Sequence, residues 1–187
     1  MCLSESTAIA AYLLSAYGNV ATGRLDRSPG DPDYAAYLQW FHYANGSLQA
    51  SMLRQMSLTF AATSESKAGT GTGPLESASV QRGRSQLEAQ LRIVDNHLGQ
   101  DGNNWFAGKE FSAADCMMGF SLTTMRGFLP FDLAPYPNIL RWLNDVAARP
   151  AYRRALDRAD GGMEPMVGPT VRTFTEFKGL KDVLGKL

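Results

Sequence analysis

The sequence is poor in the residues that build metal sites and disulfide frameworks. It has two cysteines, Cys2 and Cys116, and two histidines, His42 and His97, in 187 residues. The spacing of these four residues fits no zinc site, so we expect no metal. Two distant thiols in a chain of this size favour a reduced, cytoplasmic protein over a secreted one with disulfides.

Net charge and long apolar segments are also missing. Eighteen basic residues balance eighteen acidic residues, so no electrostatic argument favours nucleic acid or an anionic membrane as a partner. No apolar run reaches the roughly 18–20 residues of a membrane span. Residues 1–6 have no basic segment that leads into an apolar stretch, and so do not resemble a secretory signal. The composition, 44% hydrophobic and 19% charged, is that of a globular domain with a sizeable core.

Helical periodicity dominates what is present, and no segment reads convincingly as a β-strand. Apolar spacing and turn residues predict helices over residues 6–17, 34–60, 76–98, 112–127, 137–148 and 150–159. Small and polar residues predict a connection over 19–33 and a flexible loop over 61–79. The predicted fold class is all-α.

The predicted helix over 34–60 carries apolar residues on two sides. One stripe follows the helical spacing, and Trp40 and Tyr43 lie off that stripe. A second apolar face indicates a second subunit, a ligand cleft, or burial inside one large domain. Trp40, Tyr43 and Met52 are therefore candidates for a cleft or a subunit contact. His42 on the same helix is expected to be a partly buried, hydrogen-bonded histidine rather than a proton shuttle.

The sharpest local motif is Phe-Ser-Ala-Ala-Asp-Cys at 111–116. Ser112 can accept a hydrogen bond from the amide of Asp115, whose carboxylate can reach back to the amide of Ser112, and the two bonds form a capping box. Phe111 can pack on Cys116 as a hydrophobic staple. We therefore interpret Asp115 as structural rather than catalytic, and Cys116 as a core residue rather than a nucleophile.

Further segments join this motif in a resemblance to a known family. Phe-Ala-Gly-Lys-Glu-Phe-Ser-Ala-Ala-Asp at 106–115 resembles the signature of the glutathione S-transferase C-terminal domain. Tyr-Pro-Asn-Ile-Leu-Arg-Trp-Leu at 136–143 and Ala-Arg-Pro-Ala-Tyr at 148–152 look like the next two helices of that domain. Residues 40–48 are similar to the long interface helix of a fungal and bacterial branch. The resemblance implies a glutathione transferase C-terminal-like helical bundle that forms homodimers.

The homodimer implied by the resemblance uses the helices at 34–60 and 76–98. Its substrates would be glutathione, as co-substrate, and a hydrophobic electrophile, in a detoxifying conjugation. No cofactor is expected.

The N-terminal segment Leu-Ser-Glu-Ser-Thr-Ala-Ile at 3–9 resembles the Glu-Ser-x-Ala-Ile motif of the family. There the residues matching Glu5 and Ser6 hold the γ-glutamyl end of glutathione. A serine hydroxyl and free amides at a helix N-terminus favour the ligand carboxylate, and Glu5 can pair with the α-ammonium group. From the residues alone, the alternative is that Ser4 or Ser6 only caps the helix and that Glu5 is solvated.

Most of a thioredoxin-like domain precedes this motif in the family, and it carries the group that activates the glutathione sulfur. We therefore expect residues 1–18 to be a remnant of that domain, which is otherwise missing, and 19–33 to be a linker. The helical domain is expected over 34–160 and a C-terminal tail over 161–187.

No catalytic residue can be assigned in this sequence. The chain alone is expected to be inactive, and to act as a transferase only if an N-terminal domain completes it. The alternative is a non-catalytic binding or assembly module built on the helical domain. The tail, with Phe174 and Phe177, either folds over the cleft or is loosely packed.

Overall fold

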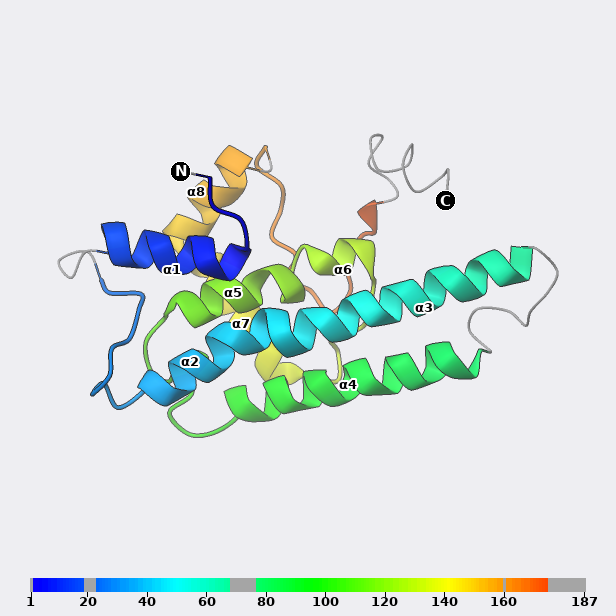
Figure 1. Cartoon of the computed structure of the whole chain (residues 1–187), viewed down its shortest axis with the longest axis horizontal. Helices are drawn as coiled ribbons and strands as arrows, with labels where there is room; N and C mark the ends of the chain where they lie inside the picture. Colours follow the sequence, from blue (N-terminus) through cyan, green and yellow to red (C-terminus); the bar gives the residue numbers. More distant parts are fainter. Residues whose placement is uncertain (1, 19–22, 68–76, 160, 175–187) are drawn as a thin grey trace.

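The structure, a computed structural model, describes residues 2–18, 23–67, 77–159 and 161–174. Within these ranges all regular secondary structure is helical, as the periodicity predicts (Figure 1). The elements are α1 Ser6–Tyr17, α2 Tyr34–Tyr43, η2 Ala44–Gln49, α3 Ala50–Lys67, α4 Ala78–Leu98, α5 Ala113–Leu122, α6 Met125–Phe128, α7 Pro137–Ala148 and α8 Pro150–Ala159. None of the described helices combines the length and apolar character needed to cross a membrane.

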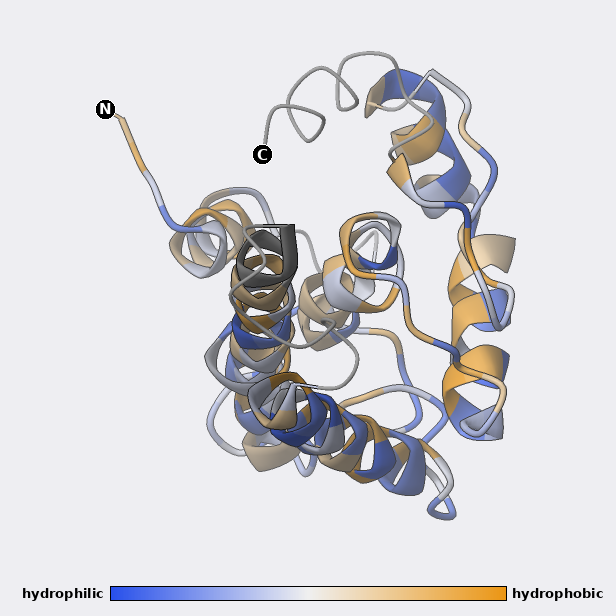
Figure 2. Ribbon diagram, turned by 90° about the vertical axis from the view of Figure 1, so that its right-hand side faces the viewer, coloured by the Kyte–Doolittle hydropathy of each residue, from blue (hydrophilic) through white to orange (hydrophobic). Residues whose placement is uncertain are grey.

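The elements α2, η2 and α3 form one continuous rod along the long axis of the molecule (Figure 1). α4 runs back beside α3, α5 packs on α2 and η2, and α7 packs on α4 with α8 beyond it. Hydrophobic and hydrophilic residues alternate around the helical ribbons, which is expected for helices with one face in a core (Figure 2). η2 is a π-helical turn over Ala-Asn-Gly-Ser-Leu-Gln, where asparagine and glycine favour the helix weakly.

The predicted loop at 61–79 is wrong at both ends. α3 continues to Lys67, seven residues past the predicted end at 60, and α4 begins at Ala78. Ala62 in the extension is buried, and such packing stabilises a helix whose small polar residues would favour it weakly in isolation. Residues 68–76 of the predicted loop lie outside the described residues.

An aromatic cluster lies in the core, where residues of the rod pack against residues of the other helices. The Trp40 ring lies 4.2 Å from that of His97 and 5.2 Å from that of Phe106, which lies 5.1 Å from that of Trp142, centroid to centroid. Trp40 and Met52 are buried, so the prediction that they line a cleft or a subunit contact was wrong. A helix packed on α5 and on α4 needs two apolar faces inside one domain.

Tyr43 and His42, which are also on α2, are less buried than Trp40. The Tyr43 hydroxyl donates a hydrogen bond to Gln90 Oε1 at 2.5 Å, which joins α2 to α4. Burial raises the pKa of Tyr43 to about 12. His42 is exposed, so the expectation of a partly buried histidine was wrong; it lies on the side of α2 that faces α1.

Asp95 on α4 is a buried carboxylate that the sequence analysis did not single out. Its Oδ1 accepts hydrogen bonds from the amides of Asn138 and Ile139, at 2.8 and 3.0 Å. Its Oδ2 accepts one from the side-chain amide of Asn138, at 3.0 Å. Asp95 therefore caps the N-terminus of α7 from a different helix.

Candidate functional site

The capping box at the start of α5 is confirmed in both directions. Ser112 Oγ accepts from the amide of Asp115, and Asp115 Oδ2 accepts from the amide of Ser112 at 2.9 Å. The carboxylate also accepts bonds at Oδ1 from the Phe106 amide, at 3.1 Å, and from Trp142 Nε1, at 2.8 Å. Burial raises the pKa of Asp115, while the hydrogen bonds from Trp142, Phe106 and Ser112 favour the ionised form and oppose the rise. Asp115 is a structural centre that joins α5, α7 and the preceding loop.

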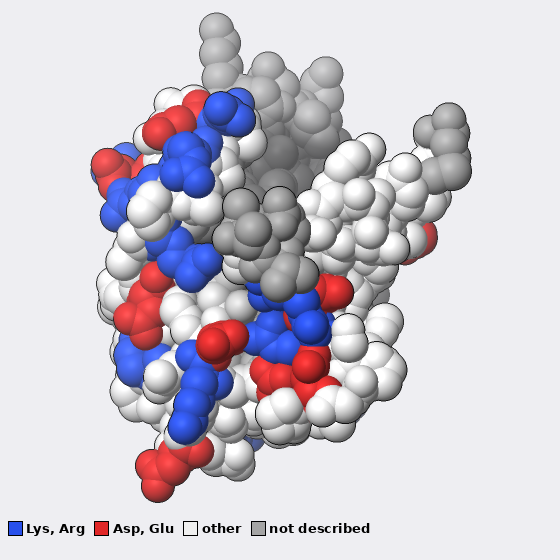
Figure 3. Space-filling view, turned by 90° about the vertical axis from the view of Figure 1, so that its left-hand side faces the viewer, with Lys and Arg blue, Asp and Glu red and all other residues white. Residues whose placement is uncertain are grey.

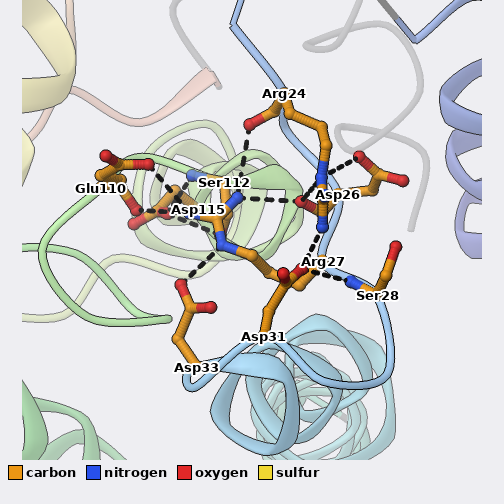
Figure 4. Close-up of polar contacts among 9 residues, drawn as sticks. All are labelled: Arg24, Asp26, Arg27, Ser28, Asp31, Asp33, Glu110, Ser112 and Asp115. Carbon is orange, nitrogen blue, oxygen red and sulfur yellow. Dashed lines mark hydrogen bonds and ion pairs between the residues drawn. The ribbon is translucent and has the colours of Figure 1, made fainter. Parts of the chain in front are cut away.

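The segment before α2, predicted as a linker, is fixed to the N-terminal turn of α5 (Figure 4). The amide of Ala113 donates to the carbonyl oxygen of Leu25 at 2.8 Å. The guanidinium of Arg27, whose side chain is only 6% exposed, pairs with Asp33 at 2.5 Å and donates to the carbonyl oxygens of Asp26 and Glu110. This arrangement fixes the segment that leads into α2 against the start of α5.

Ion pairs surround Arg27 on the same face. The Ser28 amide, together with the guanidinium of Arg24, lowers the pKa of Asp31. Basic and acidic side chains interleave on this face and do not form a patch of one sign (Figure 3). Ion pairs between arginine and aspartate side chains thus hold the segment before α2 in place.

Glu5 and Ser6 lie together at the N-terminus of α1, on the surface. Glu5 is the N-cap residue with φ 72°, and it is the one non-glycine residue with a positive φ in the described ranges. The Glu5 side chain makes no capping hydrogen bond to α1. Ser6 Oγ accepts a hydrogen bond from Asn45 Nδ2 of η2, at 2.8 Å.

α1 lies against the helical bundle with one side only. Ala10 and Leu14 pack on the core, while Ile9, Tyr12, Leu13 and Tyr17 are 39–71% exposed. Between α1, the segment at 24–27 and α2 there is a cavity of about 770 Å3, whose lining includes Thr7, Phe41 and His42. The outer side of α1 is a strongly apolar surface with no cover among the described residues.

Cys116 is exposed, so its prediction as a core residue was wrong. It lies in an apolar groove of about 400 Å3 between α5 and α8, lined also by Phe120 and Tyr152. The protein atoms around the groove desolvate the thiol and raise its pKa to about 11, which argues against a thiolate nucleophile at neutral pH. The Phe111 ring is engaged by the guanidinium of Arg149, 3.6 Å from its centroid.

No group of three or more histidine, cysteine or acidic residues that could hold a metal ion occurs in the described part of the chain. The sequence analysis named Glu5 and Ser6 as candidates, but it did not single out Asn45, which bonds to Ser6, or Arg27. The Asn-Gly pair at 45–46 inside a predicted helix was the available signal for an irregular turn at that point.

The helical architecture around Asp115 and Asp95 matches a known family. Residues 77–145 match the family model described as the glutathione S-transferase C-terminal domain. Over these residues the chain is similar to that domain. Solved structures agree on the all-helical fold: BphK, a bacterial glutathione S-transferase, matches 85% of this chain and 68% of its own, with a TM-score of 0.61 and 24% identity. The glutathione transferase URE2P6 from Phanerochaete chrysosporium matches 86% of this chain and 68% of its own, with a TM-score of 0.66 and 14% identity.

Curated proteins that are similar to this chain come from a fungus and a plant. Glutathione S-transferase 3 of Schizosaccharomyces pombe is 41% identical over 71 residues, which are 37% of this chain and 28% of that protein. Glutathione S-transferase 3 of Zea mays is 28% identical over 160 residues, 82% of this chain and 65% of that protein. The chain therefore spans less than two thirds of the length of these two relatives.

Proposed function

We propose that this chain provides the helical part of a cytoplasmic glutathione transferase, together with the anchor for the γ-glutamyl end of glutathione. The observation that carries this proposal is the backbone of Glu5, which has a positive φ at a helix N-terminus next to Ser6. A non-glycine residue in such a conformation costs about 1–3 kcal/mol, and such strain concentrates at ligand sites. Glu5 gives α1 no side-chain cap in return.

The groups at this end of α1 match the charges of a γ-glutamyl group. Ser6 Oγ accepts from Asn45, and a hydroxyl that accepts one bond can still donate its hydrogen to a ligand carboxylate. The first amides of α1 have no intrahelical acceptors and favour the same carboxylate. The Glu5 carboxylate, on the adjacent residue, can pair with the α-ammonium group. An amino acid end therefore finds a partner for both of its charges.

Substitutions of Glu5 separate its charge from its backbone strain. Glu5→Gln is expected to weaken glutathione binding at least about ten-fold, because a charge-assisted contact is lost. Glu5→Gly is expected to weaken binding equally while leaving the thermal midpoint unchanged or higher, because glycine adopts a φ of 72° without strain. Shifts of the amide signals of residues 6–8 during a glutathione titration measure the dissociation constant.

The matched control is Glu88→Gln, which removes the same charge from α4. It is expected to leave the dissociation constant unchanged. If the amides of residues 6–8 do not respond to glutathione in the unmodified chain, the proposed anchor is wrong. If they respond equally in Glu5→Gln, the site stands without a role for Glu5.

If the chain is part of a transferase, its second proposed substrate is a hydrophobic electrophile. The alternative function is a non-catalytic binding module, and one observation favours it. Burial raises the pKa of Tyr37, Tyr43 and Cys116, so none of these hydroxyl or thiol groups is adjusted to activate a sulfur nucleophile. Under either alternative we infer that the thiol-activating group is not among these three residues. Glutathione binding without conjugation of a model electrophile would favour the module.

We also propose a homodimer through α2, α3 and α4. Leu53 on α3 is 44% exposed and Ile93 on α4 is 48% exposed, and exposed apolar side chains on neighbouring helices fit a subunit contact. Light scattering is expected to give twice the monomer mass, and Leu53→Glu is expected to lower it to that of a monomer. Phe120→Glu, an equally exposed residue on α5, is the control and should leave the mass unchanged; the reverse pattern would contradict the proposed interface.

A further inference from the structure

Arg126 on α6 is a fully buried arginine whose hydrogen-bond partners are main-chain carbonyls of the C-terminal segment. Its side chain donates to the carbonyl oxygens of Met166 at 3.4 Å, Gly168 at 2.9 Å and Pro169 at 2.6 Å. Its guanidinium carbon also lies 5.7 Å from the centroid of the Phe131 ring. Burial lowers the pKa of Arg126 to about 10, so the group remains charged at neutral pH. Three carbonyl oxygens thus replace water as hydrogen-bond acceptors for a buried cation.

A second contact attaches the same segment to the same short helix. The Phe174 ring packs so closely on Gly127 that a Cβ built there would clash with the ring carbons. The ring also meets Phe128 edge to face, with centroids 4.8 Å apart. Because Gly127 has no side chain, the Phe174 ring can pack directly on the backbone of α6.

Between these two contacts the segment carries little regular structure. Residues 161–173 contain no helix or strand, and Val167 packs on the core. The amide of Leu133, a buried residue, donates to the carbonyl oxygen of Pro169 at 2.9 Å, so one carbonyl receives bonds from both Leu133 and Arg126. Segments held by few main-chain bonds open locally at a lower free energy than the whole domain.

We infer that residues 163–174 form a strap that docks on α6 and opens as one unit, with Arg126 as its latch and Phe174 as its second attachment. Arg126 Nε is buried without a hydrogen-bond partner in the docked state. That orphan donor lowers the stability of docking relative to a fully satisfied site. The strap is consequently poised between docked and open states, and opening uncovers the part of the core and of α6 that Val167 and Phe174 cover.

Hydrogen exchange with Arg126→Met tests the latch, because methionine fills much of the same volume without donors. The Leu133 amide is expected to exchange at least about ten-fold faster than in the unmodified chain. The Ile139 amide, which donates to Asp95, is expected to exchange at the unmodified rate, because α7 does not depend on the strap. An apolar dye should bind more strongly to this variant.

Arg141→Met is the matched control, since Arg141 also donates to main-chain carbonyls, of Leu98 and Asn104, and neither acceptor belongs to the strap. It should leave the Leu133 amide unchanged. Phe174→Ala removes an outer side chain and should accelerate the Leu133 amide as well, because the strap opens as a unit. This variant decides the matter if Arg126→Met does not fold.

Three outcomes would overturn the inference. The Leu133 amide could exchange in Arg126→Met as slowly as in the unmodified chain, which would mean that the strap is held elsewhere. The Ile139 amide could accelerate equally, which would make Arg126 an ordinary core residue. Phe174→Ala could leave Leu133 unaffected, which would make the two attachments independent.

Discussion

Asp115→Ala is expected to lower the free energy of unfolding by about 3–5 kcal/mol. The carboxylate accepts hydrogen bonds from the amides of Phe106 and Ser112, from the Ser112 hydroxyl and from Trp142 Nε1. Alanine leaves three of these donors buried without an acceptor, because only the hydroxyl can rotate to another partner. Each buried unsatisfied donor costs about 1–3 kcal/mol, and relief of the desolvated charge offsets part of the sum.

Asp115→Asn tests the same argument atom by atom. An asparagine oxygen in place of Oδ1 keeps the bonds from Phe106 and Trp142, but its NH2 group faces the amide of Ser112, which is also a donor. We expect about half the loss seen for alanine. Urea denaturation followed by tryptophan fluorescence measures both values, since Trp142 is part of the network.

Asp145→Ala is the control for the Asp115 variants. Asp145 pairs with Arg141 one turn away on the exposed side of α7, and a pair of this kind contributes less than about 1 kcal/mol. A loss for Asp115→Ala no larger than that for Asp145→Ala would contradict the structural role of Asp115.

Asp95→Ala is expected to lower the free energy of unfolding by about 2–3 kcal/mol. α7 begins with Pro137, which has no amide hydrogen. The next two amides, of Asn138 and Ile139, both donate to Asp95 Oδ1. Removing the carboxylate therefore leaves the first turn of α7 with two amides lacking their acceptor, one of them on the fully buried Ile139.

Thermal and urea unfolding measure the Asp95 effect, and hydrogen exchange locates it. The amides of Asn138 and Ile139 should lose protection before those of α5. Asp101→Ala, on an exposed turn, is expected to change stability by less than about 0.5 kcal/mol. Equal effects of the two substitutions would show that α7 does not need a cap from α4.

The sequence predicted local features well where neighbouring residues cause them. The Ser112–Asp115 box involves residues three apart, so the motif alone indicated both reciprocal bonds. The bounds of α1, α7 and α8 also follow from apolar spacing, proline and glycine over short stretches. The resemblance to the glutathione S-transferase C-terminal domain rests on these same local motifs, and the family match over 77–145 agrees with it.

Burial was predicted less well because it depends on what packs against each helix. Trp40 was a candidate for a cleft and is in the core, whereas Cys116 was assigned to the core and is exposed. Apolar periodicity shows that a face needs a partner, but it does not say whether α4, α5 or another molecule supplies it. The same ambiguity applies to the outer side of α1.

What the sequence by itself determined is the helical class, the local cap of α5 and the pair Glu5-Ser6 as a candidate anchor. Only the tertiary structure decided that Asp95 caps α7, that Asn45 bonds to Ser6, and that Arg126 donates to main-chain carbonyls of the C-terminal segment, including those of residues 168 and 169. Each of these contacts joins residues about forty positions apart. Their side chains carry no local signal, because a buried carboxylate or guanidinium is stable only where the fold brings its hydrogen-bond partners.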